Sequence, residues 1–111
     1  MSRIGIIPGI QVFDPEGRLL RKWGNDGDED GQFSQPVGIA VDGEGNVYVV
    51  DAGNHRIQVF DQEGQFLRKW GSNGYADGEF FWPDGIAVDG EGRVYVSELF
   101  NHRIQVFRPA G

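Results

Sequence analysis

The sequence predicts an all-β fold built from small repeated sheets, and three observations lead to this prediction. The segment NHRIQVF stands at 54–60 and again at 101–107, and its last four letters also stand at 10–13. These copies share a spacing of 47 residues, and 31 of 47 positions agree when 10–56 is written over 57–103. The apolar runs are short, are separated by turn residues, and lack the 3.6-residue period of a helix. Repeats of this length stack against neighbours to bury their apolar faces.

Four strands are expected in each period. Their residues are mainly β-branched, aromatic or aliphatic, and the turns between them carry Asp, Gly, Asn or Pro. The expected strands are IQVF at 10–13, RLLRKW at 18–23, GIAV at 38–41, VYVV at 47–50, IQVF at 57–60 and FLRKW at 66–70. The second copy repeats this order, with an inner strand at 86–88 and a final IQVF at 104–107. A long loop precedes each inner strand, and in the first copy this loop is polar.

The strands are apolar on both sides, which indicates that each sheet is covered on both faces. Small four-stranded antiparallel sheets with two buried faces describe the blades of a β-propeller, packed face to face around an axis. Gly38 and Ala40 suit the crowded innermost strand. The Arg-Lys pairs at 21–22 and 68–69 suit the outermost strand, where charge discourages pairing with other chains.

The chain divides into a terminal segment, two repeats and an extra strand. Residues 1–9 do not match the repeat and are interpreted as an N-terminal adaptor. Residues 10–56 form repeat 1, which is circularly permuted relative to a blade, and residues 57–103 form repeat 2. Residues 104–111 add a strand and a C-terminal tail. Two blades cannot close a ring, so several copies of the chain are expected to assemble into one propeller.

A ring of such chains has one strand too many. Three IQVF copies and two copies of every other strand give nine strands for eight places. At the junction between chains, the copies at 10–13 and 104–107 compete for one place. The C-terminal copy is expected to keep it, because it follows its partner strand through a short turn and loses little loop entropy. Residues 18–23 then form the outer strand of a neighbouring chain's blade.

The composition favours a basic partner. Seventeen acidic and ten basic residues give a formal charge of −7, which opposes binding to nucleic acid or to an anionic membrane. The chain has no cysteine, and therefore no disulfide and no thiolate zinc site. The apolar run at 4–7 is too short for a signal sequence or a membrane span. A soluble protein without a cofactor is expected.

The pattern PxGIAVDxxGNVYVxDxxNHRIQVFDxxGxFLxxxG resembles the NHL repeat, named for an Asn-His-aliphatic triplet whose third place is here taken by Arg. The similarity covers residues 10–107. It implies a propeller, usually of six blades, that serves as a binding platform for protein or RNA and in some members as a lyase. Six blades favour a homotrimer, with an eight-bladed tetramer as the alternative. The near-identical copies also fit a fragment or an engineered or reconstructed protein.

The repeated Asn-His-Arg triplet is interpreted as structural. His55 and His102 are too far apart to share a metal, because equivalent turns stand roughly 15 Å from the axis and a ligand bond measures about 2 Å. The triplets are instead expected to cap their turns and to hydrogen-bond to Asp51, Glu98 or neighbouring backbone. Their residues are Asn54, His55, Arg56, Asn101, His102 and Arg103.

Alternating acids in the first long loop make a weak calcium candidate. Asp26, Asp28 and Asp30 have the spacing of a calcium loop. The twelfth loop position is Val37 instead of Glu, and the second copy keeps one of the three acids. No metal site is therefore favoured.

Differences between the copies point to a ligand-binding face. Twelve of the 16 differing positions lie in the loop before the inner strand or the turn between the second and third strands. Both connections emerge on one propeller face, because strands alternate in direction. The expected ligand-binding residues are Trp82, Asp84, Tyr75, Phe81, Leu99, Phe100 and Gln35. The acids expected there are Asp26, Asp28, Glu29, Asp30, Asp51, Asp77, Glu79, Asp84 and Glu98. The alternative is that Phe81 or Phe100 fills a gap between blades.

The leading hypothesis is a non-enzymatic, homo-oligomeric scaffold that binds a basic protein or peptide. No Ser-His-acid spacing, GxGxxG or P-loop is present. The alternative is a metal-dependent lyase-like or hydrolytic enzyme with its site over the central channel. RNA binding is a weaker alternative, because phosphate contacts need Lys and Arg.

Overall fold

The computed structural model describes residues 9–108 and places them in eleven β-strands and one short 3-10 helix. Residues 1–8, most of the expected adaptor, and residues 109–111 lie outside the described part. No helix within 9–108 is long and apolar enough to cross a membrane. The elements are β1 (Ile10–Phe13), β2 (Leu19–Trp23), β3 (Asn25–Asp26), β4 (Gln32–Phe33), β5 (Pro36–Val41), β6 (Val47–Asp51), η1 (Ala52–Asn54), β7 (Arg56–Phe60), β8 (Phe66–Trp70), β9 (Pro83–Val88), β10 (Val94–Glu98) and β11 (Arg103–Phe107).

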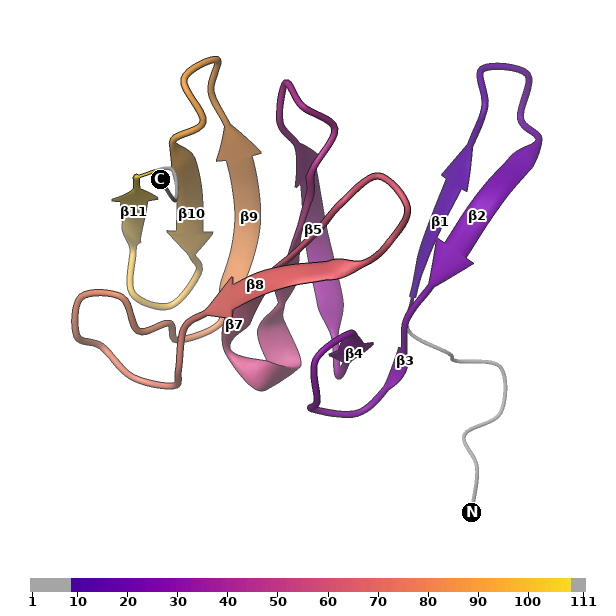
Figure 1. Ribbon diagram of the computed structural model, residues 1–111. Coiled ribbons are helices and arrows are strands. Elements are labelled where there is room, and N and C mark those ends of the chain that lie inside the picture. Colours follow the sequence, from indigo (N-terminus) through magenta and orange to yellow (C-terminus); the bar gives the residue numbers. More distant parts are fainter. Residues whose placement is uncertain (1–8, 109–111) are drawn as a thin grey trace.

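One four-stranded sheet lies in the middle of the molecule (Figure 1). Its strands are antiparallel neighbours in chain order, β5-β6-β7-β8. Consecutive pairing of this kind is the expected plan of one propeller blade, with β5 innermost and β8 outermost. The inner strand is longer than predicted, because it already begins at Pro36.

Two incomplete sheets flank the central one (Figure 1). On one side, the hairpin β1-β2 corresponds to the third and fourth strands of a blade. On the other side, β9-β10-β11 correspond to the first three strands. These three sheets contain two, four and three strands, which are the nine strands expected from the sequence. Within residues 9–108 the chain therefore forms an open row of sheets.

The two middle strands of the central sheet, β6 and β7, are buried on both faces, as the apolar run at 47–50 predicts. Each of these four residues is at most 7% exposed. The cluster on the hairpin side contains Ile10, Phe33, Val47, Val49 and Phe60. The cluster on the opposite side contains Tyr48, Val50, Ile57, Val59, Phe80, Val94 and Val96. Burying one such aliphatic side chain stabilises the fold by about 1.5–3 kcal/mol.

The outward face of the last sheet is open. In β7, Ile57 and Val59 are 0% exposed, because β9 and β10 pack against them. Their equivalents in β11, Ile104 and Val106, are 66% and 54% exposed. The same sequence is thus a core strand in one sheet and a surface strand in the next.

A buried phenylalanine anchors each long loop. Phe33 and Phe80 are 0% exposed, and each ring lies 5.8 Å from a strand ring, that of Phe60 or Phe107. Gly24 opens the first loop with a φ of 105°, and a Cβ there would lie 2.7 Å from the Phe33 ring. Only glycine fits this close approach. Within the loop, β3 and β4 pair in parallel, a ladder that was not predicted because its polar residues show no alternating pattern.

Candidate functional site on the loop face

The long connections gather at one end of the sheets (Figure 1). The loops 24–35 and 71–82 and the turns 52–55 and 99–102 emerge there, whereas the short hairpin turns emerge at the other end. We call this end of the sheets the loop face. The twelve clustered differences between the repeats lie in these connections or directly beside them.

The Asn-Arg pair of the first triplet fastens loop 24–35 to the central sheet. Arg56 Nε donates to Asp51 Oδ2 at 3.2 Å, and Asn54 Nδ2 donates to the same oxygen at 2.8 Å. The terminal nitrogens of Arg56 donate to three loop carbonyls, those of Asp28 at 2.9 Å, Glu29 at 3.0 Å and Gln32 at 2.8 Å. Asp51 and Arg56 are 0% and 6% exposed, so the two residues form a buried ion pair.

The second repeat builds the same arrangement around Glu98. Arg103 Nε donates to Glu98 Oε2 at 2.5 Å, and its terminal nitrogens donate to the carbonyls of Tyr75, Ala76 and Glu79. Burial alone would raise the pKa of Glu98, but hydrogen bonds outweigh it and hold the pKa below the usual value. The donors are Arg103, the Phe81 N–H, Asn101 and Gln105. Glu98 is therefore a charged structural carboxylate at neutral pH.

Two acids expected on the surface of the loop face are buried instead. Asp51 and Glu98 are 0% and 2% exposed, because each accepts hydrogen bonds from the loop that crosses it. They cannot attract a partner directly. The acids of this end that are exposed are Asp26, Asp28, Glu29, Asp30, Asp77 and Asp84.

The histidines shape the turns through their backbone. His55 and His102 adopt the left-handed conformation, with φ of 57° and 53°. The His55 N–H donates to the Ala52 carbonyl at 3.2 Å and closes η1. Its ring lies edge-on to Trp82, with 6.4 Å between the ring centroids.

The acids of the calcium candidate are not gathered around a common point. Within residues 9–108, no group of three or more His, Cys, Asp or Glu side chains is placed to hold a metal ion. Asp30 pairs with Lys69 at 2.6 Å, and Asp28 contributes its carbonyl oxygen to Arg56. The loop that carries Asp26, Asp28 and Asp30 is instead organised by Arg56.

Five of the predicted ligand residues lie together and form what we call the aromatic patch: Tyr75, Phe81, Trp82, Leu99 and Phe100. Ring centroids are 5.1 Å apart for Tyr75 and Phe81, 6.1 Å for Phe81 and Phe100, and 6.3 Å for Phe100 and Trp82. Four members are well exposed, Tyr75 by 65%, Phe100 by 56%, Leu99 by 55% and Trp82 by 39%. An exposed chain of aromatic contacts is unusual on a monomeric surface and is typical of a binding site.

Paired changes between the repeats create the aromatic patch. In the first repeat, Ser34 lies so close to Gly53 that a Cβ on Gly53 would overlap the Ser34 hydroxyl. In the second repeat, Phe81 and Phe100 occupy these two positions and face each other. Phe100 is 56% exposed in the single chain, in which no further sheet lies beyond β9-β10-β11 within residues 9–108.

Trp82 holds an unusual backbone conformation. Its φ is 57°, in the left-handed region that a bulky side chain rarely adopts. Such strain persists only where the surroundings impose it, and it clusters at functional sites. The Leu99 N–H donates to the Trp82 carbonyl at 3.1 Å, and the Ala52 N–H makes the equivalent bond to Gln35, whose φ is not positive.

The other two predicted ligand residues have different surroundings. Asp84 accepts a hydrogen bond from the Ser97 hydroxyl at 2.8 Å. Gln35 occupies the position of Trp82 in the first repeat, is exposed, and donates its N–H to Asp51 at 3.1 Å. The Asp84 contact lies within the last sheet, and the Gln35 contact joins loop 24–35 to the central sheet. Neither residue takes part in the ring contacts of the aromatic patch.

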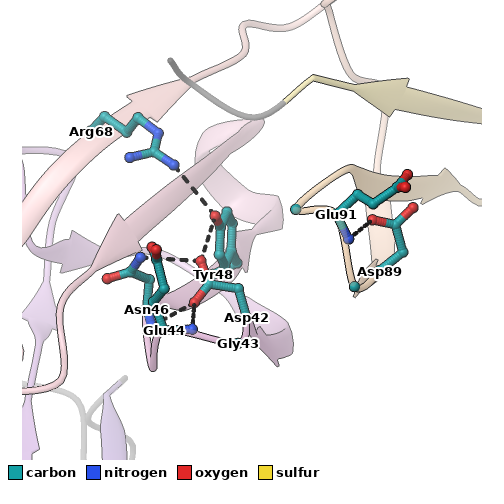
Figure 2. Close-up of a pocket in the computed structure, with 10 residues that line it drawn as sticks. Asp42, Gly43, Glu44, Asn46, Tyr48, Arg68, Asp89 and Glu91 are labelled. Atoms are coloured by element: carbon teal, nitrogen blue, oxygen red, sulfur yellow. Dashed lines mark hydrogen bonds between the residues drawn. The ribbon is translucent and has the colours of Figure 1, made fainter.

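A hollow of about 400 Å³ at the opposite end was not predicted. It lies between the turns 42–46 and 89–93 of neighbouring sheets (Figure 2). Tyr48 donates its hydroxyl hydrogen to Asp42 at 3.1 Å, and Arg68 donates to the Tyr48 hydroxyl at 3.3 Å. Burial and the Asp42 carboxylate raise the pKa of Tyr48. The repeated DGEGxVY segment was the sequence signal that could have located this hollow. The carboxylates of Asp42 and Asp89 in this segment accept hydrogen bonds from backbone N–H groups of their own turns.

The chain forms a row of small antiparallel sheets, and each long loop is hydrogen-bonded to an arginine of the neighbouring sheet. These features define an all-β repeat protein of the propeller type. The sequence pattern of the NHL repeat matches residues 33–60 and 80–107, which together make up half of the chain. The chain therefore belongs to the NHL-repeat family. It is similar to B-box type zinc finger protein ncl-1 of Caenorhabditis elegans, with 50% identity over 36 residues, 32% of this chain. The match covers 4% of that protein's length.

Proposed function

We propose that this chain is a non-enzymatic NHL-type propeller scaffold, assembled from several copies, that binds a basic protein segment on its loop face. The aromatic patch is the observation that carries the proposal. Its rings touch one another, yet four of its five side chains are between 39% and 65% exposed. Covering these side chains with a partner removes apolar area from water, which is the main favourable term in association.

The charge around the patch selects the partner. Asp77 is exposed on the loop that carries Tyr75 and Phe81, and Asp28 and Glu29 are exposed on the neighbouring loop. The whole chain carries a formal charge of −7. Arg and Lys side chains are attracted to such acids and also stack over Trp and Tyr rings. A peptide segment that combines basic and apolar residues fits both features, whereas the phosphates of RNA would be repelled.

Assembly is supported by the apolar faces that a single chain leaves open. Ile104 and Val106 are more than half exposed, although the same residues of β7 are fully buried. Two blades per chain and a six-bladed ring give a trimer. Native mass spectrometry should then find a particle of about three times 12.3 kDa, and four times that mass would indicate eight blades. A single chain at every concentration would contradict the assembly.

The binding proposal is tested with a peptide array. The array contains Arg- and Lys-rich amphipathic peptides, acidic peptides of the same length, and single-stranded RNA oligonucleotides. Basic peptides should bind the wild-type chain, and Phe100→Ala or Trp82→Ala should weaken binding by about 1–3 kcal/mol, or roughly 5- to 150-fold. Phe13→Ala is the matched control, because Phe13 is 53% exposed but lies in β1.

Two results would contradict the binding proposal. Equal loss of binding in the Phe13 control would show that the aromatic patch is not the site. Selective binding of RNA would replace the peptide by a nucleic acid partner. Elemental analysis of the purified protein separately tests the enzyme alternative, since stoichiometric bound metal would support a lyase-like or hydrolytic site.

A further inference from the structure

We infer that, when the ring closes, β11 of a second copy replaces β1 in the sheet. In the single chain, β1 occupies the position that β11 of the second copy takes in the ring. The inference rests on the proposed assembly and specifies how it is made. In the single chain, β1 pairs with β2 and covers one face of the central sheet. In the ring, β11 of a second copy performs both roles, and residues 10–13 leave the sheet.

The pairing of β2 allows this exchange without a change of register. In the single chain β2 pairs with β1 as Ile10 with Trp23, Gln11 with Lys22, Val12 with Arg21 and Phe13 with Leu19. In the complete sheet β8 pairs with IQVF of β7 in the same way. Strand β11 contains the same four residues at 104–107, and β10 occupies its other edge. β2 therefore meets an identical partner sequence in β11.

The face contacts are equivalent as well. Ile10 is 8% exposed, and it packs in one cluster with Val47 and Val49. One period later along the chain, Ile57 packs in one cluster with Val94 and Val96. Ile104 is the next copy of this residue and is 66% exposed, with no sheet beside it in the described chain. Placed on the central sheet of a second copy, Ile104 would replace Ile10 contact for contact.

The second copy also covers a surface that β1 cannot reach. Ile39 and Val41 of β5 are 51% and 58% exposed, because the hairpin β1-β2 has no inner strands. Their equivalents in β9, Ile86 and Val88, pack against the central sheet. A second copy brings β9 and β10 together with β11, so it covers Ile39 and Val41 while β1 leaves them in water. This additional burial favours exchange.

Buried polar contacts decide which strand leaves. Arg103 and Gln105 at β11 donate to Glu98, which is 2% exposed. Removing β11 would leave this carboxylate buried without its cation, which is strongly unfavourable. At β1, Gly9 stands in the place of the arginine, and Gln11 is exposed. Removing β1 leaves no buried charge behind, so β1 is the strand that is displaced.

Disulfide trapping tests the exchange directly, because the chain has no cysteine of its own. Directly opposite residues on antiparallel strands are close enough for a disulfide. Arg21→Cys combined with Val106→Cys should give chains linked to one another on a non-reducing gel. The matched control, Arg21→Cys combined with Val12→Cys, should lock the hairpin within one chain and abolish assembly. An assembled protein in which the first pair forms no inter-chain bond would overturn the inference.

Single substitutions supply a second readout. Ile104→Lys should leave the single chain folded, because the side chain is already exposed, and should abolish assembly. Leu67→Lys, at a side chain 44% exposed on the rim of the central sheet, should still assemble. Ile10→Ser should lower the concentration of half-assembly of a trimer by roughly 30-fold if β1 keeps about nine-tenths of the chains closed, because each of the three chains must release β1.

The outcomes separate this inference from the proposed function. If Ile104→Lys assembles like the wild type while Ile10→Ser does not assemble, β1 is the permanent strand. The exchange would then be wrong, and the oligomeric scaffold would stand. If the wild-type chain stays single at all concentrations, the assembly itself is wrong, and the exchange is excluded with it.

Discussion

Replacing Arg56 by Met tests whether the triplet fastens loop 24–35 to the sheet. The substitution keeps a long side chain but removes the cation, which leaves Asp51 at 0% exposure without its charged partner. Breaking a buried ion pair from one side costs about 3–5 kcal/mol. The three carbonyls released by Arg56 lie in an exposed loop and can bind water, so they add little. The loss is large against a typical total stability of about 5–15 kcal/mol.

The second repeat provides a matched control within the same chain. The side chain of Arg103 is 27% exposed, against 8% for Arg56, so water screens the charge left on Glu98 more effectively. Urea unfolding at low chain concentration, followed by circular dichroism, should show a smaller loss for Arg103→Met, by at least about 1 kcal/mol. An equal or larger loss at Arg103, or less than about 1 kcal/mol at Arg56, would refute the reasoning.

Three further predictions follow from individual contacts. The folded pKa of Glu98 lies below its usual value of 4.5, so its contribution to stability is complete above that pH and is lost as the pH falls through the folded pKa. Glu98→Gln should therefore flatten the acid side of the profile of melting temperature against pH. An unchanged profile would show that the Glu98 carboxylate does not contribute to stability in this way. Gly24→Ala should destabilise by more than about 1 kcal/mol in thermal melts, because its Cβ meets the Phe33 ring, whereas Gly43→Ala, with open space around it, should stay within about 0.5 kcal/mol. Phe33→Ala should cost about 3–5 kcal/mol in urea unfolding, and a loss below about 1 kcal/mol would show that loop 24–35 is not anchored by this ring.

The strand plan of the chain could be predicted because it follows from short-range pattern. Residues 47–50 are apolar in sequence on both sides of the strand, and both sides are buried in the fold. The spacing of 47 residues places equivalent strands at equivalent places in successive sheets. The four-stranded central sheet is confirmed in this way. Closure of the ring depends on contacts between chains and stays a prediction.

The roles of loop residues could be predicted only in part. Phe33 lies in a loop that is otherwise polar, and Phe80 lies in one that also carries Tyr75, Phe81 and Trp82. The burial of both rings depends on how the loop folds back and not on a local period. One signal was available, since this Phe is the single apolar residue that is identical in the two copies of a loop in which most positions differ. From the sequence, Asp51 and Glu98 were expected on the surface because they are charged. Each carboxylate is instead buried and accepts a hydrogen bond from the arginine five positions later.

In this protein the frame that holds the loop face is separate from the side chains displayed on it. The Ser34 and Phe81 N–H groups both donate to the carboxylate at the end of the second strand, at 2.9 Å and 3.0 Å. The Ala52 and Leu99 N–H groups both donate to a carbonyl of the opposite loop, at 3.0 Å and 3.1 Å. Backbone groups make these bonds, so Ser can become Phe and Ala can become Leu without loss of the scaffold. Binding preference at this face can therefore diverge from one repeat to the next while the framework stays constant, much as variable loops do on a fixed sandwich.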